Sequence, residues 1–124
     1  MELRIVRRTD HFDQACRFWG ELLGCPVTRQ WPADEHQGQG RIFGYGDVAR
    51  IEFIEVASPE PVTGLTLGLE VDDADAVHER MLAAGVTVLR PPADQPWGHR
   101  NVAVVDPSGI EVTFFHWLPT AAPH

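Results

Sequence analysis

The sequence predicts an α+β fold in which two β-α-β-β-β modules form an incomplete, cupped β-barrel. The same order of strand-like and helix-like segments occurs twice, with a period of about 60 residues, which indicates an internal duplication. Short motifs mark equivalent places in the two modules: Leu23-Gly24 with Ala84-Gly85, and Ile51-Glu52-Phe53 with Ile110-Glu111-Val112. One helix per module covers one sheet face, so the opposite, concave faces are left to close around a shared cavity.

The length and composition fit one domain of a soluble protein. The chain has 124 residues, 44% of them hydrophobic, and a net charge of −8. This charge argues against a nucleic-acid partner and favours a cationic small molecule, although it also serves solubility. Cys16 and Cys25 match neither a zinc cluster nor a disulfide framework. Without a membrane-length apolar stretch or a leader pattern, we expect a cytoplasmic protein with no membrane partner.

The first module is expected within about residues 1–57. Leu3–Arg7 alternates as an opening strand, and Thr9-Asp10 offers an N-cap for a helix that ends at Gly24. This helix has apolar residues at helical spacing: Phe12, Ala15, Cys16, Trp19, Leu22 and Leu23. The polar stretch Pro32–Gly40 is a predicted loop. The remaining strands are predicted at Pro26–Trp31, Arg41–Tyr45 and Ala49–Val56.

A linker at residues 58–64 leads to the second module, expected at about residues 65–118 and followed by a tail at 119–124. Leu65–Val71 is a predicted strand with its leucines on one face. Asp72-Asp73 caps a helix that ends at Gly85. Its predicted buried stripe consists of Ala74, Val77, Met81 and Leu82. Val86–Arg90 is a predicted strand and Pro91–Gly98 a predicted loop.

A closing hairpin completes the second module. Its strands are Asn101–Val105 and Ile110–Trp117, and Asp106-Pro107-Ser108-Gly109 forms the turn between them. Alternation places Ile110, Val112 and Phe114 on one face, with Glu111, Thr113 and Phe115 on the other. Before the hairpin, proline and glycine bracket Trp97, so the loop presents this indole ring instead of burying it along a strand.

These features resemble the vicinal oxygen chelate superfamily, the group of glyoxalase I, bleomycin-resistance proteins and extradiol dioxygenases. Besides the modules, the resemblance rests on Phe18-Trp19 before Leu23-Gly24, and on Gln95-Pro96-Trp97-Gly98 before Asp106-Pro107-Ser108-Gly109. It covers the whole chain and is more specific for the fold than for the reaction. The Phe-Trp and Gln-Pro-Trp-Gly motifs look most like the bleomycin-resistance branch. The resemblance also implies a homodimer, with cavities at or near its interface.

Metal-dependent members of this superfamily hold a divalent ion through His, Gln or Glu on the first and last strands of each module. Carried onto this chain, these positions fall at Arg4, Glu52, Thr66 and Thr113, and only Glu52 is a usual ligand. A fixed charge on Arg4 would repel a cation. We therefore expect no metal cofactor, and an ion pair between Arg4 and Glu52 instead. A divalent ion such as Ni, Zn, Mn or Fe, held by Glu52 and Glu111, is the fallback.

Two functions stay open at this stage. The first is a metal-independent protein that binds and sequesters an aromatic or cationic natural product, as bleomycin-resistance-type proteins do. The second is a glyoxalase-type lyase, isomerase or dioxygenase with a rearranged metal site around Glu52 and Glu111. No catalytic residue is assigned, and the aromatic side chains also suit a core or a dimer interface. The predicted ligand-binding residues are Arg4, Trp31, His36, Glu52, Trp97, His99, Glu111, Thr113, Phe115 and Trp117.

Overall fold

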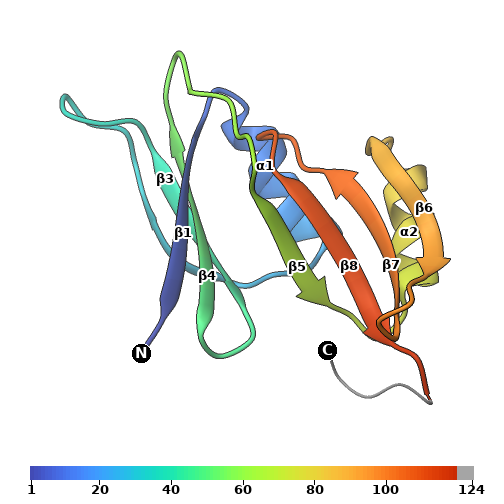
Figure 1. The fold of residues 1–124 in the computed structure, drawn as a ribbon. Helices are drawn as coiled ribbons and strands as arrows, with labels where there is room; N and C mark the ends of the chain where they lie inside the picture. The colour runs from blue at the N-terminus through green and yellow to red at the C-terminus, as the bar shows by residue number, and fades with distance from the viewer. Residues whose placement is uncertain (120–124) are drawn as a thin grey trace. The chain divides into compact units, whose positions relative to one another are not determined.

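The computed structural model describes residues 1–119, so the end of the predicted tail, His124 included, lies outside the described residues. The chain forms two compact units, the first from Met1 to Pro61 and the second from Val62 onward. Each unit holds one four-stranded mixed sheet and one helical segment (Figure 1). The predicted α+β class is confirmed, and within residues 1–119 the strands form two sheets and no closed barrel.

The first sheet has the strand order β1-β4-β3-β2. The elements of this unit are β1 (Leu3–Thr9), α1 (Phe12–Cys16), the π-helical η1 (Arg17–Leu22), β2 (Val27–Trp31), β3 (Gly40–Tyr45) and β4 (Ala49–Glu55). Strand β1 pairs in parallel with β4, whereas the other two pairings are antiparallel. The two central strands carry most of the buried residues of the sheet, and the edge strands are largely exposed.

The first helix begins and continues differently from the prediction. We expected Thr9-Asp10 to supply the N-cap, but the N-cap residue is His11, without a side-chain cap. Thr9 is the last residue of β1, and its Oγ1 accepts a hydrogen bond from His11 N at 3.0 Å. After a short α-helical stretch the backbone becomes π-helical, since the Leu23 amide donates to the carbonyl of Phe18.

Aromatic rings join this helical segment to one face of the first sheet. The ring of Phe53 lies 6.2 Å from that of Trp19 and 6.4 Å from that of Phe43, measured between centroids. Gly20 lies against Phe43, because a Cβ atom on Gly20 would approach Phe43 Cε1 to 2.9 Å. Strand alternation therefore turns Glu52 to the opposite side. We refer to this helix-free side, which carries Arg4, Trp31 and Glu52, as the first open face.

The second sheet repeats this arrangement, with the order β5-β8-β7-β6. Its elements are β5 (Thr66–Glu70), α2 (Ala74–Ala83), β6 (Val88–Asp94), β7 (His99–Val105) and β8 (Glu111–Trp117). The first and last strands of the unit are again parallel neighbours, and the other pairs are antiparallel. The same strand order in both units supports the predicted duplication.

Helix α2 is capped as predicted but buries fewer residues than predicted. Asp73 is the N-cap, and its Oδ1 accepts hydrogen bonds from the amides of the two residues after Ala74. Val77 and Met81 are buried, as is Ala74. The prediction for Leu82 is wrong, since this residue is 57% exposed. Leu82 follows Met81 directly and is therefore rotated by ~100° around the helix, away from the sheet.

Strand β6 extends further than predicted. We expected Val86–Arg90 to be the strand and Pro91–Gly98 a loop, but β6 continues through Pro91 and Pro92 to Asp94. The pairing with β7 is irregular, with register shifts on both sides of Arg90. Because β6 is an edge strand, a proline there can lack its amide hydrogen without breaking a central ladder.

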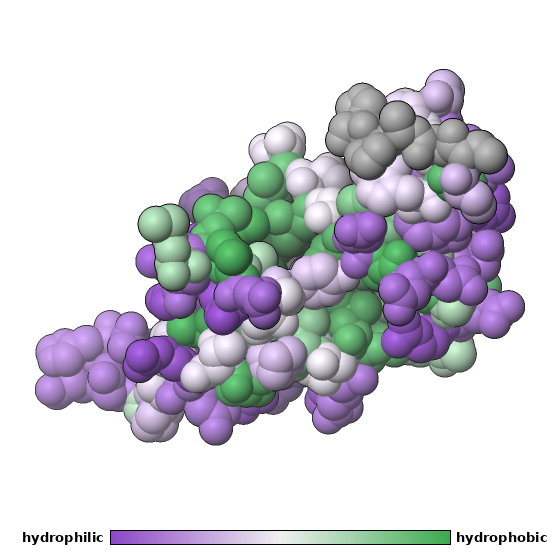
Figure 2. Space-filling model, turned by 90° about the horizontal axis from the view of Figure 1, so that it is seen from below, coloured by the Kyte–Doolittle hydropathy of each residue, from purple (hydrophilic) through white to green (hydrophobic). Residues whose placement is uncertain are grey.

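Several large apolar side chains remain exposed in both units. On the face seen in Figure 2, apolar and hydrophilic residues alternate over short distances. The exposed apolar residues are Met1, Leu3, Val6, Val27, Val48, Leu65, Leu82, Leu89 and Trp97. The homodimer stays a prediction. In residues 1–119, no helix is long and apolar enough to cross a membrane.

Candidate functional site

The first open face carries the predicted ion pair. Arg4 Nη1 lies 3.0 Å from Glu52 Oε1, and Arg4 also contacts Glu2 through Nε, at 2.7 Å, and Nη2, at 2.6 Å. The hydrogen bonds to Glu2 and then Glu52 raise the pKa of Arg4 above its ordinary value. Glu52 is only 7% exposed, so the guanidinium stabilises a carboxylate that is largely shielded from water.

Trp31 lies at the end of β2, against the backbone of β3. Its indole ring occupies the position that a side chain on Gly40 would need. The indole Nε1 is buried and has no hydrogen-bond partner among the described residues. A cavity of about 260 Å³ adjoins it, lined by Gln30, Trp31, Pro32, Gln39, Gly40 and Arg41. Trp31 is therefore packed against the sheet, with an unused donor at its edge.

On the helix-free side of the second sheet, the second open face, four rings form what we term the aromatic cluster: Trp97, His99, Phe115 and Trp117. His99 is its centre, stacked on Phe115 with centroids 4.9 Å apart. The rings of Trp97 and Trp117 lie 5.4 and 5.5 Å from His99. Pairing between β7 and β8 causes this convergence, because His99 lies opposite Trp117. The structure thus brings together four residues that the sequence predicted separately.

Hydrogen bonds fix the orientation of the rings. Trp97 Nε1 donates to His99 Nε2 at 2.8 Å, and Asn101 Nδ2 lies 3.0 Å from the same nitrogen. An indole nitrogen can only donate, so His99 Nε2 is an acceptor and the imidazole carries its proton on Nδ1. Gln95 Nε2 donates to Asn101 Oδ1 at 3.2 Å, which directs the Asn101 amide toward His99. Asn101 was not predicted from the sequence as a site residue, although it is two residues from His99 on one strand and therefore shares its face.

The second open face becomes polar at its other end. Thr66 Oγ1 donates a hydrogen bond to Glu111 Oε2, and Arg90 Nη1 lies 3.8 Å from Glu111 Oε1. Thr113 lies on the same face, between Glu111 and Phe115, and is partly exposed. This face therefore combines a polar end, formed around Glu111, with an aromatic end.

His36 lies apart from the other candidates of its unit. It is in the loop between β2 and β3, and its side chain is 83% exposed. Its Nε2 is 3.3 Å from Glu35 Oε1, and its amide donates to Asp34 Oδ1 at 2.8 Å. The described residues show no contact of His36 with Trp31 or Glu52. The loop thus holds His36 in solvent instead of on the open face.

The side chains at the family's metal positions do not fit a divalent ion. Residues 1–119 contain no group of three His, Cys, Asp or Glu side chains arranged to hold one. The two fallback ligands, Glu52 and Glu111, each lie beside an arginine. A guanidinium at this distance competes with a cation for the same carboxylate oxygens. Thr66 and Thr113 add only neutral hydroxyl groups.

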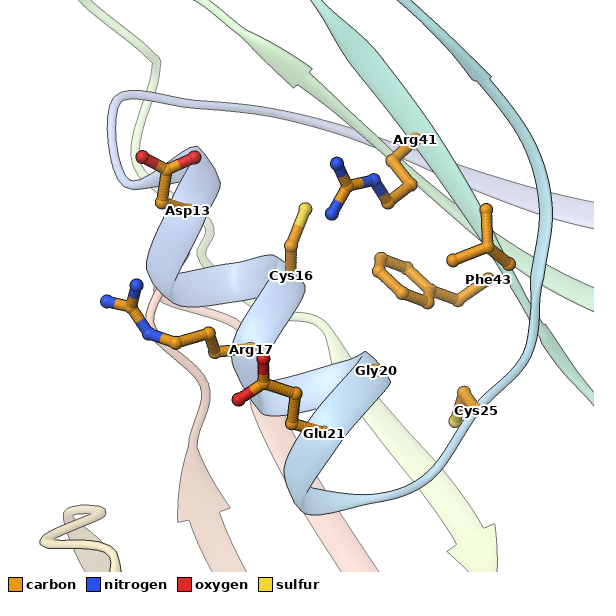
Figure 3. Close-up of a pocket in the computed structure, with 9 residues that line it drawn as sticks. Asp13, Cys16, Arg17, Gly20, Glu21, Cys25, Arg41 and Phe43 are labelled. Atoms are coloured by element: carbon orange, nitrogen blue, oxygen red, sulfur yellow. The ribbon is translucent and has the colours of Figure 1, made fainter.

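The first unit also holds a pocket that the sequence did not predict. It has a volume of about 430 Å³ and lies between the helical segment and strands β2 and β3 (Figure 3). It is lined by Asp13, Cys16, Arg17, Gly20, Glu21, Cys25, Val27, Arg41 and Phe43. These residues come from separate elements and share no motif, so no signal in the sequence marks them as one site.

Comparisons with known proteins identify the fold and the family. TnmS3, an antibiotic binding protein from Streptomyces sp. CB03234, superimposes with a TM-score of 0.75 at 23% identity, covering 94% of this chain and 95% of that one. A V278E glyoxalase I mutant from Zea mays gives a TM-score of 0.79 at 17% identity, covering 92% of this chain and 43% of that one. At these identities the likeness shows the fold alone.

A relative among the curated sequences is the uncharacterized protein Mb0911c from Mycobacterium bovis. It is 44% identical over 55 residues, which span 44% of this chain and 33% of that protein. The match therefore covers about a third of the relative's length. The model of the Glyoxalase/Bleomycin resistance protein/Dioxygenase superfamily, by contrast, matches residues 3–114. The chain belongs to the Glyoxalase/Bleomycin resistance protein/Dioxygenase superfamily.

Proposed function

We propose that this protein binds and sequesters a planar aromatic natural product that carries a cationic group, and that it does so without a metal ion. The aromatic cluster is the observation that carries the proposal. Its rings are held by the hydrogen bond between Trp97 and His99 and by the stacking of His99 on Phe115. Rings fixed before binding lose little conformational entropy when a ligand stacks on them.

The accessible surface of the cluster fits an aromatic ligand. Trp97 is 45% exposed, and Phe115 and Trp117 are partly exposed. A planar ligand can therefore cover indole surface that now faces water, while the buried side of each ring stays packed. TnmS3, which shares the fold, is described as an antibiotic binding protein, and this supports the same class of ligand.

Two carboxylates on the second open face, Glu70 and Glu111, support a cationic group on the ligand. At Glu111 that group would take the place of the Arg90 guanidinium, which lies 3.8 Å from Oε1. Glu111 is four residues before Phe115 on β8, and Glu70 pairs with Phe115 from β5. The rise along a strand separates Glu111 from Phe115 by roughly 13 Å. A ligand that uses both ends therefore has its cationic group on an extended arm. The net charge of −8 adds a favourable long-range field.

Binding of two acridines tests this proposal. Quinacrine has a planar ring system with a cationic side arm, and 9-aminoacridine has the related ring system without the arm. We expect Trp97→Ala and Phe115→Ala each to weaken both ligands by about tenfold, the value of one lost stacking contact. Glu111→Gln should weaken quinacrine more than 9-aminoacridine. Trp31→Phe, on the first sheet, is the matched control and should leave both affinities unchanged. Tryptophan fluorescence provides the titration signal.

Added chelator separates this function from a metal-dependent one. We expect quinacrine affinity to be the same with and without EDTA. If Trp97→Ala and Phe115→Ala leave quinacrine affinity unchanged, the aromatic cluster is not the ligand site. Binding that appears only with Ni, Zn, Mn or Fe(II) would favour a glyoxalase-type enzyme instead.

A further inference from the structure

Arg41 is partly buried, and among residues 1–119 it forms no ion pair with a carboxylate. It extends from β3 toward the helical segment, and Figure 3 shows its guanidinium next to the thiol of Cys16. Its Nε is buried and has no hydrogen-bond partner among residues 1–119. Its guanidinium carbon lies 5.7 Å from the centre of the Phe12 ring. By contrast, Arg4 and Arg100 each contact two carboxylates.

The nearby thiols do not balance this positive charge. Burial raises the pKa of Cys16, and the charge of Arg41 only partly opposes that shift. Burial also raises the pKa of Cys25 to about 11. Both thiols are therefore neutral near pH 7. A partly buried guanidinium with an unused N–H group and no counter-ion is costly, and an anionic ligand would remove that cost.

The pocket beside Arg41 has the size and walls of a small-ligand site. Its volume of about 430 Å³ falls within the range that binds small molecules. Val27 and Phe43 are the apolar side chains that line it, and Gly20 packs closely against the ring of Phe43. Two carboxylates, Asp13 and Glu21, also line the pocket and disfavour a multiply charged anion.

We propose that this pocket is a second ligand site, which takes a small monocarboxylate with an apolar body. The carboxylate binds the guanidinium of Arg41, which matches its planar geometry, and the apolar body lies against Phe43 and Val27. The site is on the helix side of the first sheet, whereas the aromatic cluster belongs to the second sheet. It therefore does not depend on the function proposed above.

Benzoate is the probe, and two-dimensional amide NMR of the whole chain is the measurement. We expect benzoate to shift the amide signals of α1, η1, β2 and β3. Arg41→Gln should weaken benzoate at least about tenfold, the effect of losing a charge-assisted hydrogen bond. Val27→Phe fills the pocket while leaving Arg41 in place, and should weaken benzoate similarly. Arg29→Gln removes the same charge from an exposed position on β2 and should have no effect.

Each other outcome overturns the proposal. If benzoate at concentrations well above millimolar shifts no amide signals, the pocket is not a carboxylate site. Shifts confined to β7 and β8, or affinity unchanged in both Arg41→Gln and Val27→Phe, would do the same. Inorganic phosphate binding more tightly than benzoate would contradict the monocarboxylate class. If Arg41→Gln fails to fold, Val27→Phe alone decides. Phe115→Ala should retain benzoate binding, so this site and the aromatic cluster can fail separately.

Discussion

Trp97 and His99 are joined side chain to side chain by a hydrogen bond of 2.8 Å, from the indole nitrogen to Nε2 of the imidazole. The same two rings meet edge to face, at an interplanar angle of 74°. Trp97 lies in the turn before β7, and His99 is the first residue of that strand. The bond thus ties a half-exposed indole ring to the end of a central strand.

We predict that His99→Phe releases Trp97. The phenyl ring keeps the stacking on Phe115 but offers no acceptor, so the indole N–H should exchange with solvent faster. Proton NMR of the indole signals measures this exchange. His36→Phe is the matched control, because His36 is exposed in a loop of the other unit. An unchanged Trp97 exchange rate in His99→Phe would show that the hydrogen bond does not hold the ring.

We predict that Arg4→Met lowers the free energy of unfolding by about 1–2 kcal/mol. The change leaves the carboxylate of Glu52, which is only 7% exposed, without its guanidinium. The expected loss of unfolding free energy is smaller than for a fully buried ion pair because Arg4 itself is 37% exposed. Urea unfolding measures it, and Arg8→Met, an exposed change on the same strand, should have little effect. Equal effects of the two changes would contradict a specific pair.

We predict that the contribution of Asp75 to stability is lost in acid. The hydrogen bonds from Arg100, at 3.0 and 3.1 Å, lower the pKa of Asp75 in the folded state. A lowered pKa gives stability that is present above the unfolded-state value and disappears as pH falls through the folded value. Asp75→Asn should therefore reduce the melting temperature at pH 7 and match the wild type in strong acid. Asp72→Asn is the control, and a difference that persists in acid would contradict the linkage.

We predict that Gly20→Ala destabilises the first unit by about 1–3 kcal/mol, the usual cost of overpacking. The added methyl group would lie 2.9 Å from the ring of Phe43, and that ring is buried. Gly68→Ala is the control, because its methyl group would lie at an ordinary 3.7 Å from Phe115. Thermal unfolding compares the two, and a Gly20→Ala protein as stable as Gly68→Ala would show that Phe43 can move aside.

We predict that the protein binds Ni, Zn, Mn and Fe(II) far below one ion per chain. At both fallback ligands, Glu52 and Glu111, an arginine competes with the cation. Elemental analysis of protein incubated with each metal and then desalted gives the content. Arg4→Met is the informative variant, since it frees Glu52. One ion per wild-type chain would contradict this prediction and favour the enzyme interpretation.

The fold could be predicted from the sequence because the patterns that indicate its strands, helices and turns are local and occur twice. Alternation predicted which residues of β8 face the helix and which face the open side, and the burial of Val112 and Phe114 agrees. The resemblance to the superfamily, through its metal positions, grouped Arg4 with Glu52, which the structure places 3.0 Å apart. The prediction was wrong in β6, because its two prolines indicate a loop but lie in an edge strand, which tolerates proline.

By itself, the sequence determined the order of the elements, the duplication and the faces of the strands, since hydrophobic periodicity and turn residues act over a few positions. Only the tertiary structure decided that His99 is the centre of the aromatic cluster, because strand register sets which residue lies opposite Trp117. It also decided that Arg41 shares a pocket with Cys16 and Gly20. Those contacts join a helix to a strand, and periodicity predicts which face of each element is buried but not which of their residues meet.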